Sequence, residues 1–339
     1  MKAAFYEGNE TVSLGHCQIE APGPNQVRLQ IAYCGICGTD LHIFHGKMDK
    51  RVTFPQIMGH ELSATVAEVG AGVTHVKPGQ PVTVMPLDWC GDCPACEAGH
   101  THICHKLKFL GIDTPGAFQG SWTVPARAVL PMPEGINLQK GALIEPIAVA
   151  CHDVRLGGVK PGDDVVVLGG GPIGALVAMV ARDAGARVVV SEINAFRLNM
   201  LKDLGFEVVN PLEQDLEAAE MTMTGGKGAE VVFEVTAHPA GIEVATKLPR
   251  TRGTIVLVGI FATPPPVDLF KFFWRELKLL GARVYEKEDF EKAIALVASQ
   301  QLPLDILVSK VLPLTDLEQG FRFLESGADA MKVLIDCQA

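Results

Sequence analysis

The sequence predicts an α/β protein that combines a doubly wound parallel sheet with a second, β-rich domain. Between residues 165 and 284, six short apolar runs alternate with mostly apolar helical segments, which is the pattern of parallel strands joined by crossover helices. The flanking segments instead carry short strand-like runs punctuated by glycine and proline. Because 339 residues suffice for two cores, we place one domain at residues 153–299 and the other at residues 1–152 together with 300–339.

The bulk composition is that of a folded protein, with 48% hydrophobic and 20% charged residues. The sequence has neither a run of about 18 apolar residues nor a basic-then-apolar leader, so we expect a cytoplasmic protein with no membrane partner. The formal net charge of −10 argues against nucleic acid as a partner, because the phosphates would be repelled.

In the β-rich domain, alternating apolar positions and turn residues predict strands near both ends of the chain. The expected strands are residues 2–6, 27–32, 62–69, two short strands within 73–84, and 332–336, with irregular β-like structure over 105–135. Residues 139–156 and 314–327 are expected to be helical. In the other domain, the expected strands are residues 165–168, 188–191, 208–210, 231–235, 255–258 and 279–284, and the expected helices include 195–204, 242–248 and 289–300.

The centre of the second domain is the glycine-rich turn that follows the apolar run V-V-V-L. Gly169, Gly171 and Gly174 fit G-x-G-x-x-G, and an alanine-rich helical segment follows. The first glycine allows a tight turn, the second lets a pyrophosphate approach the backbone, and the third lets helix pack on strand. The start of this helix, where Ile173 follows Pro172, offers free N–H groups beyond the proline and a positive dipole end to the phosphates.

An acid at the end of the next predicted strand completes this pattern. Glu192 lies 18 residues after Gly174, about where a ribose-binding carboxylate is expected. A carboxylate there accepts the ribose hydroxyls and repels a 2′-phosphate, so NAD is favoured over NADP. Arg197 lies nearby and keeps NADP as an alternative, and a nucleotide-free α/β domain with a solvated Glu192 is also possible.

Four of the nine cysteines form a compact pattern, C-x2-C-x2-C-x7-C, at Cys90, Cys93, Cys96 and Cys104. Four thiolates this close can complete the tetrahedral shell of a structural Zn²⁺. An iron–sulfur cluster is an alternative, whereas disulfides are disfavoured in a chain without an export signal. The earlier C-x-x-C of Cys34 and Cys37 is typical of either a redox pair or half of a zinc site.

Three signals therefore occur in order: G-I-C-G-T-D-L-H with a later G-H-E, the four-cysteine segment, and a dinucleotide fold. Together they resemble the zinc-dependent medium-chain alcohol dehydrogenases, and most of all the branch with sorbitol (polyol) and threonine dehydrogenases. The resemblance spans essentially the whole chain. It implies a GroES-like catalytic domain and a Rossmann domain with the active site between them, and two zinc ions per chain.

The resemblance also implies roles for individual residues. Cys37, His60 and Glu61 match the catalytic zinc segment, and Glu145 matches an acid that the polyol branch brings to the same metal, directly or through water. The four-cysteine segment matches the structural zinc lobe. Thr39 and His42 match a proton relay, and Asp40 matches an acid that orients His60.

The implied reaction is the reversible oxidation of a secondary alcohol, in a polyol, sugar alcohol or aldonate, to a ketone with NAD as hydride acceptor. Zinc lowers the pKa of the alcohol, Thr39 takes the proton, and His42 passes it towards solvent. The alternatives are an L-threonine 3-dehydrogenase, a 2,3-butanediol-type dehydrogenase, and a non-catalytic nucleotide-binding protein on the same fold. The resemblance further implies a homo-oligomer, a homotetramer or a dimer, and the aromatic segment 270–274 is expected to lie in a core or a subunit interface.

Overall fold

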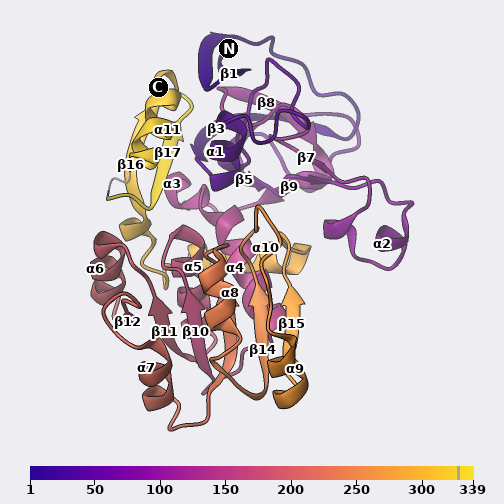
Figure 1. The fold of residues 1–339 in the computed structure, drawn as a ribbon. Helices are drawn as coiled ribbons and strands as arrows, with labels where there is room; N and C mark the ends of the chain where they lie inside the picture. The colour runs from indigo at the N-terminus through magenta and orange to yellow at the C-terminus, as the bar shows by residue number, and fades with distance from the viewer. Residues whose placement is uncertain (327–328) are drawn as a thin grey trace. The chain divides into compact units, whose positions relative to one another are not determined.

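The structure is a computed structural model that describes residues 1–326 and 329–339. It divides into two compact units (Figure 1), one formed by Met1–Glu145 with Glu286–Ala339 and the other by Pro146–Tyr285. The division expected from the sequence, with one domain at residues 153–299 and the other at 1–152 and 300–339, stays a prediction. No helix in the described ranges is both long enough and apolar enough to cross a lipid bilayer.

The first unit is built on a seven-stranded sheet in the order β16-β17-β3-β4-β5-β9, with β8 also paired to β3. Its central strand, β3 (Gln26–Gly35), pairs antiparallel with β4 (Glu61–Val69) on one side and with β17 (Lys332–Asp336) on the other. Alternate β3 residues such as Leu29 and Ile31 are fully buried, because alternate side chains point to the same face of a sheet. The remaining strands of this sheet are β5 (Pro81–Val84), β8 (Ser121–Pro125), β9 (Val129–Pro131) and β16 (Val308–Pro313).

Smaller elements complete the first unit. Two two-stranded sheets are formed by β1 (Lys2–Gly8) with β2 (Thr11–His16), and by β6 (Leu87–Asp88) with β7 (Lys108–Phe109). The helices are α1 (Gly38–Phe44), α2 (Pro94–Glu97), α3 (Leu138–Gly141), α10 (Lys287–Ser299) and α11 (Leu317–Glu325), with short 3-10 helices at Thr101–Ile103, Ala126–Ala128, Leu304–Leu307 and Leu314–Asp316. Helix α10 buries one face through Phe290, Ala293 and Val297, which recur at the spacing of an amphipathic helix.

The second unit is built on a six-stranded parallel sheet in the order β12-β11-β10-β13-β14-β15. Residues 165–167 of the central strand β10 (Asp164–Leu168) are fully buried, because a central parallel strand is covered on both faces and reads as a continuous apolar run. The other strands are β11 (Arg187–Ser191), β12 (Glu207–Val209), β13 (Ala229–Glu234), β14 (Pro249–Leu257) and β15 (Lys278–Gly281). The helices of this part of the chain are α4 (Ile144–Gly157), α5 (Pro172–Asp183), α6 (Ala195–Asp203), α7 (Leu216–Met223), α8 (Pro239–Ala245) and α9 (Leu269–Arg275) (Figure 1).

Several elements differ from the sequence-based expectation. The single helix expected over residues 139–156 is two helices, α3 and α4, separated by a turn at residues 142–143. Asn137 is the N-cap of α3, and its side chain accepts from the N–H groups of Gln139 and Lys140. Only β5 forms within residues 73–84, because the preceding segment is taken up by turns, with the Val73 N–H bonded to the Gly70 carbonyl and the Gln80 N–H to the Lys77 carbonyl. The predicted helix over 314–327 starts as a 3-10 turn, and its expected end lies outside the described residues.

Candidate active site and metal centres

Three potential metal ligands meet in the first unit. The ligand atoms of Cys37, His60 and Glu61 all lie within 4.8 Å of one another. Cys37 is the N-cap of α1, and Glu61 begins β4 opposite Gly35 of β3. His60 and Glu61 are only 3% and 1% exposed. A cation at this cluster would therefore be largely shielded from water.

The cluster is also strongly anionic. The fully buried Asp40 accepts the Cys37 N–H at Oδ2 (2.9 Å), and its Oδ1 lies 3.7 Å from His60 Nδ1. Burial raises the pKa of Asp40. Burial by itself lowers the pKa of His60, but the negative charges of Asp40 and Cys37 outweigh it and raise the pKa to about 10. Such an environment favours a positive charge.

The donor set fits zinc. A thiolate, an imidazole and a carboxylate are all ligands that Zn²⁺ accepts, and three protein ligands leave a position open for water or substrate. Asp40 Oδ1 and His60 Nδ1 are buried and have no hydrogen-bond partner within the described ranges. An orientation in which Asp40 receives the Nδ1 proton would leave Nε2 of His60 for a metal.

Glu145 lies close to this cluster but outside the group of three. It sits in the first turn of α4 and is 5% exposed. Its charge contributes to raising the pKa of both His60 and Lys332, so its carboxylate faces the same region. Whether it binds a metal directly or through water stays a prediction.

Thr39 and His42 lie on α1, next to the cluster in sequence. They are three residues apart and therefore share one face of the helix. His42 is exposed to solvent. Partial desolvation and the positive Lys47 and His45 lower its pKa. A largely neutral, solvent-facing imidazole suits a proton acceptor at the outer end of a relay.

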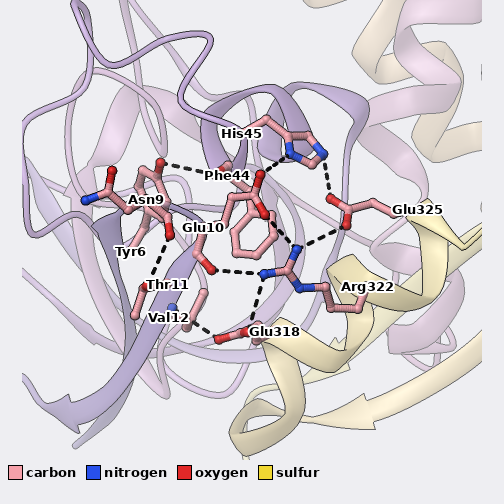
Figure 2. Close-up of polar contacts among 10 residues, drawn as sticks. All are labelled: Tyr6, Asn9, Glu10, Thr11, Val12, Phe44, His45, Glu318, Arg322 and Glu325. Carbon is pink, nitrogen blue, oxygen red and sulfur yellow. Dashed lines mark hydrogen bonds and ion pairs between the residues drawn. The ribbon is translucent and has the colours of Figure 1, made fainter.

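The nearby His45 instead has a structural environment (Figure 2). Its Nδ1 lies 3.0 Å from Glu10 and its Nε2 lies 2.6 Å from Glu325, while Arg322 contacts both carboxylates at 2.8 and 3.5 Å. Because both ring nitrogens are engaged, His45 ties the end of α1 to the β1–β2 turn and to α11. A substrate-lining role for His45 is therefore disfavoured.

The four-cysteine segment forms a second metal-type cluster, because the Sγ atoms of Cys90, Cys93, Cys96 and Cys104 lie within 4.8 Å of one another. Cys104 Sγ is 3.4 Å from Cys90 and 3.8 Å from Cys93, too far for a disulfide. Backbone N–H groups of Cys96 and His105 lower the pKa of Cys93 to about 6. The pKa of Cys104 is also lowered, whereas those of Cys90 and Cys96 are raised, so two of the four thiols are favoured as thiolates before a metal binds. Four thiolates at this spacing are the ligand set of a structural Zn²⁺.

In the second unit, the glycine turn follows β10 and leads into α5. Gly169 has φ +99°, and a Cβ on Gly174 would lie 1.8 Å from the Gly169 carbonyl oxygen. Only glycine fits at these two positions. The chain leaves β10 towards β11 on one side and continues through β13 on the other, so the turn lies at the topological switch point where open parallel sheets bind nucleotides.

Glu192 directly follows β11 and contacts the glycine turn. Its Oε2 accepts the Gly170 N–H (2.8 Å), and its Oε1 accepts the N–H groups of Ile193 (2.7 Å) and Asn194 (2.8 Å). Arg197 Nη1 lies 3.9 Å from Oε2. The carboxylate predicted to bind ribose therefore also fixes the turn, and the positive Arg197 lies within reach of the same place.

Sequence reasoning missed two buried charged residues. Glu234 ends β13, beside β10, and its carboxylate accepts the N–H groups of Thr236 (2.9 Å) and Ala237 (3.3 Å). The sequence signal that could have identified Glu234 is an acid directly after the apolar run V-V-F. Lys332, near the C-terminus, contacts Glu61. No local sequence pattern around either residue indicates this contact.

The comparisons with known proteins agree with this geometry. The alcohol dehydrogenase GroES-like domain matches residues 23–134, and the zinc-binding dehydrogenase model matches residues 172–299. Over 339 residues the chain is 52% identical to the 2-dehydro-3-deoxy-L-galactonate 5-dehydrogenase of Pseudoalteromonas atlantica, covering 100% of this chain and 99% of that protein. The chain belongs to the zinc-dependent medium-chain alcohol dehydrogenases.

Two further members of this dehydrogenase family are also similar. The L-galactonate-5-dehydrogenase of Escherichia coli is 33% identical over 305 residues, covering 90% of this chain and 89% of that protein. A zinc-binding dehydrogenase from Sinorhizobium meliloti, solved with NADP bound, has a TM-score of 0.91 and 30% identity, covering 99% of this chain and 98% of that one. These matches confirm the predicted family and the predicted fold class, a GroES-like domain with a Rossmann domain. They also confirm the predicted enzyme class, a dehydrogenase acting on CH–OH.

Proposed function

We propose that this dehydrogenase oxidises a secondary hydroxyl of a sugar acid or a related polyol to a ketone, with zinc at the Cys37–His60–Glu61 cluster and NAD as hydride acceptor. The observation that carries the proposal is the meeting of these three donors in a buried, anionic site. The names of two relatives, both dehydrogenases of a galactonate or its deoxy derivative, support an aldonate as substrate class.

The protein groups near the cluster have separate tasks in this proposal. When bound, zinc supplies a Lewis acid that lowers the pKa of the substrate hydroxyl. Thr39 accepts the hydroxyl proton, and His42, whose pKa is lowered and which faces solvent, carries the proton away. Asp40 holds the ring of His60 in place from Oδ1. Glu145 adds negative charge beside the same cluster.

Cofactor binding is assigned to the second unit. Gly169 allows the turn and Gly174 the close packing of α5, while the backbone at Gly171 and the start of α5, where Ile173 follows Pro172, receives the pyrophosphate. Glu192 accepts the ribose hydroxyls and disfavours a 2′-phosphate, so NAD is preferred. Arg197 keeps NADP as the secondary cofactor, in line with the NADP found in one structural relative.

The exposed apolar surface of the second unit supports a homo-oligomer, a dimer or a homotetramer. Phe270, Phe273 and Trp274 of α9 are 65%, 79% and 72% exposed, and the adjoining β15 is an edge strand of the sheet. Exposed aromatic clusters and free strand edges mark association surfaces. Light scattering on the wild type and on a Phe273→Glu variant tests this, since only the wild type should be larger than one chain. A cytoplasmic location stays a prediction.

A metal analysis combined with a substrate screen tests the proposed function. The screen measures NAD and NADP reduction with L-galactonate, 2-dehydro-3-deoxy-L-galactonate, sorbitol, L-threonine and 2,3-butanediol. We expect two zinc ions per chain and turnover of an aldonate. Turnover of L-threonine or butanediol alone would move the substrate class to those alternatives. One zinc per chain, NAD binding and no turnover would refute catalysis in favour of a nucleotide-binding protein.

A further inference from the structure

A buried lysine faces the proposed catalytic metal site. Lys332 Nζ donates to both carboxylate oxygens of Glu61, at 2.6 and 2.8 Å, and to the backbone carbonyl of Ile36 at 3.2 Å. Lys332 is 5% exposed and Glu61 is 1% exposed. A lysine this deeply buried is rare unless a carboxylate compensates its charge, so the pair is a built feature of the site.

The order of strands explains how the two side chains meet. Glu61 lies on β4 and Lys332 on β17, and β3 runs between these two strands. At the crossing point β3 has Gly35, which is paired with Glu61 on one side and with Leu334 of β17 on the other. A Cβ on Gly35 would lie 2.4 Å from Glu61 Oε2. The absence of a side chain at Gly35 is therefore what lets the carboxylate reach the ammonium across β3.

The same carboxylate is also a candidate metal ligand. Its oxygen lies within 4.8 Å of the ligand atoms of Cys37 and His60, while both of its oxygens are engaged by Lys332. Lone pairs that accept an ammonium are less available to a cation on the other side. The ammonium and a metal would therefore compete for the same carboxylate.

We propose that Lys332 is a positioning residue that holds the Glu61 carboxylate across Gly35 and thereby restrains it from binding the catalytic metal tightly. The ammonium shares the Glu61 carboxylate with the metal, so Glu61 stays a weakly held third ligand beside Cys37 and His60. This inference rests on the proposed function, because it requires zinc at Cys37 and His60. It assigns to the pair a role in metal affinity and geometry as well as in folding.

The test measures metal binding without turnover. Wild type, Lys332→Met and the double variant Lys332→Met/Glu61→Gln are stripped of the metal at the Cys37 site, and Co²⁺ is titrated while its visible absorption spectrum is recorded. We expect Lys332→Met to bind Co²⁺ about tenfold or more tightly (~1.4 kcal/mol) with a changed spectrum, because the released carboxylate becomes a stronger ligand. Adding Glu61→Gln should abolish this gain. A gain that persisted in the double variant would reflect only the lost positive charge and would overturn the proposal.

Further variants guard against a folding defect. Gly35→Ala keeps both charges, but its Cβ displaces the Glu61 carboxylate from Lys332. It should therefore change the Co²⁺ affinity and spectrum in the same direction as Lys332→Met. Lys332→Arg keeps the charge and should stay close to the wild type. Lys310→Met removes a lysine of the neighbouring strand β16, whose ammonium lies over the ring of Phe323 in α11. This variant should keep the Co²⁺ affinity and spectrum of the wild type.

Two results would refute this inference in different ways. If Lys332→Met and Gly35→Ala both matched the wild type in Co²⁺ affinity and spectrum, Lys332 would be a purely structural partner of Glu61. If the wild type itself bound no metal at Cys37, the proposed function would fail and this inference with it.

Discussion

Glu192→Gln separates the contact of one carboxylate with the glycine turn from the ribose role that we propose for it. Glu192 Oε1 accepts two N–H groups, from Ile193 and Asn194, and Oε2 accepts one, from Gly170. A glutamine that keeps its oxygen on Ile193 and Asn194 must point its NH₂ group at the Gly170 N–H, so that two donors face each other. The substitution therefore removes mainly the bond between the end of β11 and the phosphate-binding turn.

The size of the effect follows from burial. Glu192 is 7% exposed, so water does not readily replace the lost acceptor. A buried donor left without a partner costs about 1–3 kcal/mol, and we expect the free energy of unfolding to fall by that amount. The neutral amide also no longer repels a 2′-phosphate. The preference for NAD over NADP should then fall roughly tenfold, which corresponds to ~1.4 kcal/mol.

Chemical denaturation and kcat/KM with each cofactor measure these two effects independently. Glu207→Gln, at an exposed position on the neighbouring strand β12, is the matched control and should change neither. An unchanged free energy of unfolding in Glu192→Gln would refute the tie to the turn. An unchanged ratio of kcat/KM for NAD and NADP would refute the ribose role.

Three other substitutions test the remaining assignments. Cys37→Ser should lower turnover on the order of a thousandfold with the melting temperature nearly kept, measured by NAD reduction and calorimetry; near-full activity would remove Cys37 from the metal site. Cys96→Ser should lose one zinc per chain and melt several degrees lower, because metal binding is part of the folding free energy of such a lobe; unchanged melting in a thermal scan would contradict this. The lowered pKa of His42 predicts that kcat/KM holds as the pH falls to below about 6.5 and drops only when the imidazole is protonated. His42→Asn should remove that acidic limb and slow the reaction, and an identical pH–rate profile would exclude the relay.

The parts of the site that lie close together in sequence were predictable. Cys90 and Cys104 are connected by a short segment whose turns must bring the thiolates together, and the glycine turn follows its strand directly. The physical constraint is local in both cases: only glycine fits the backbone at Gly169 and Gly174, and only a few residue types bind zinc. The structure accordingly gathers the residues that the motifs named.

The residues that were missed depend on pairing between distant strands. Lys332 is 271 positions from Glu61, and only the placement of β3 between β4 and β17 brings them together. The role of Gly35 is equally hidden, because a glycine in a strand can serve many purposes. The division of the helix predicted at residues 139–156 lies at a turn over Ala142 and Leu143, where the Leu143 N–H bonds the Lys140 carbonyl three residues back, and the apolar pattern runs through this turn without a break.

The discontinuity of the first unit has a consequence for biosynthesis. Strand β3 and the candidate metal ligands Cys37 and His60 are translated early, whereas β17, which pairs with β3 and brings Lys332, follows the whole of Pro146–Tyr285. A chain emerging from the ribosome folds N-terminal parts first, and pairing strands so far apart in sequence is slow. The second unit, formed from one continuous stretch, can fold while the first sheet still lacks its partner strand. The first sheet is then completed late, after Pro146–Tyr285 has been synthesised, so the surroundings of Cys37 and His60 are finished only when the end of the chain is available.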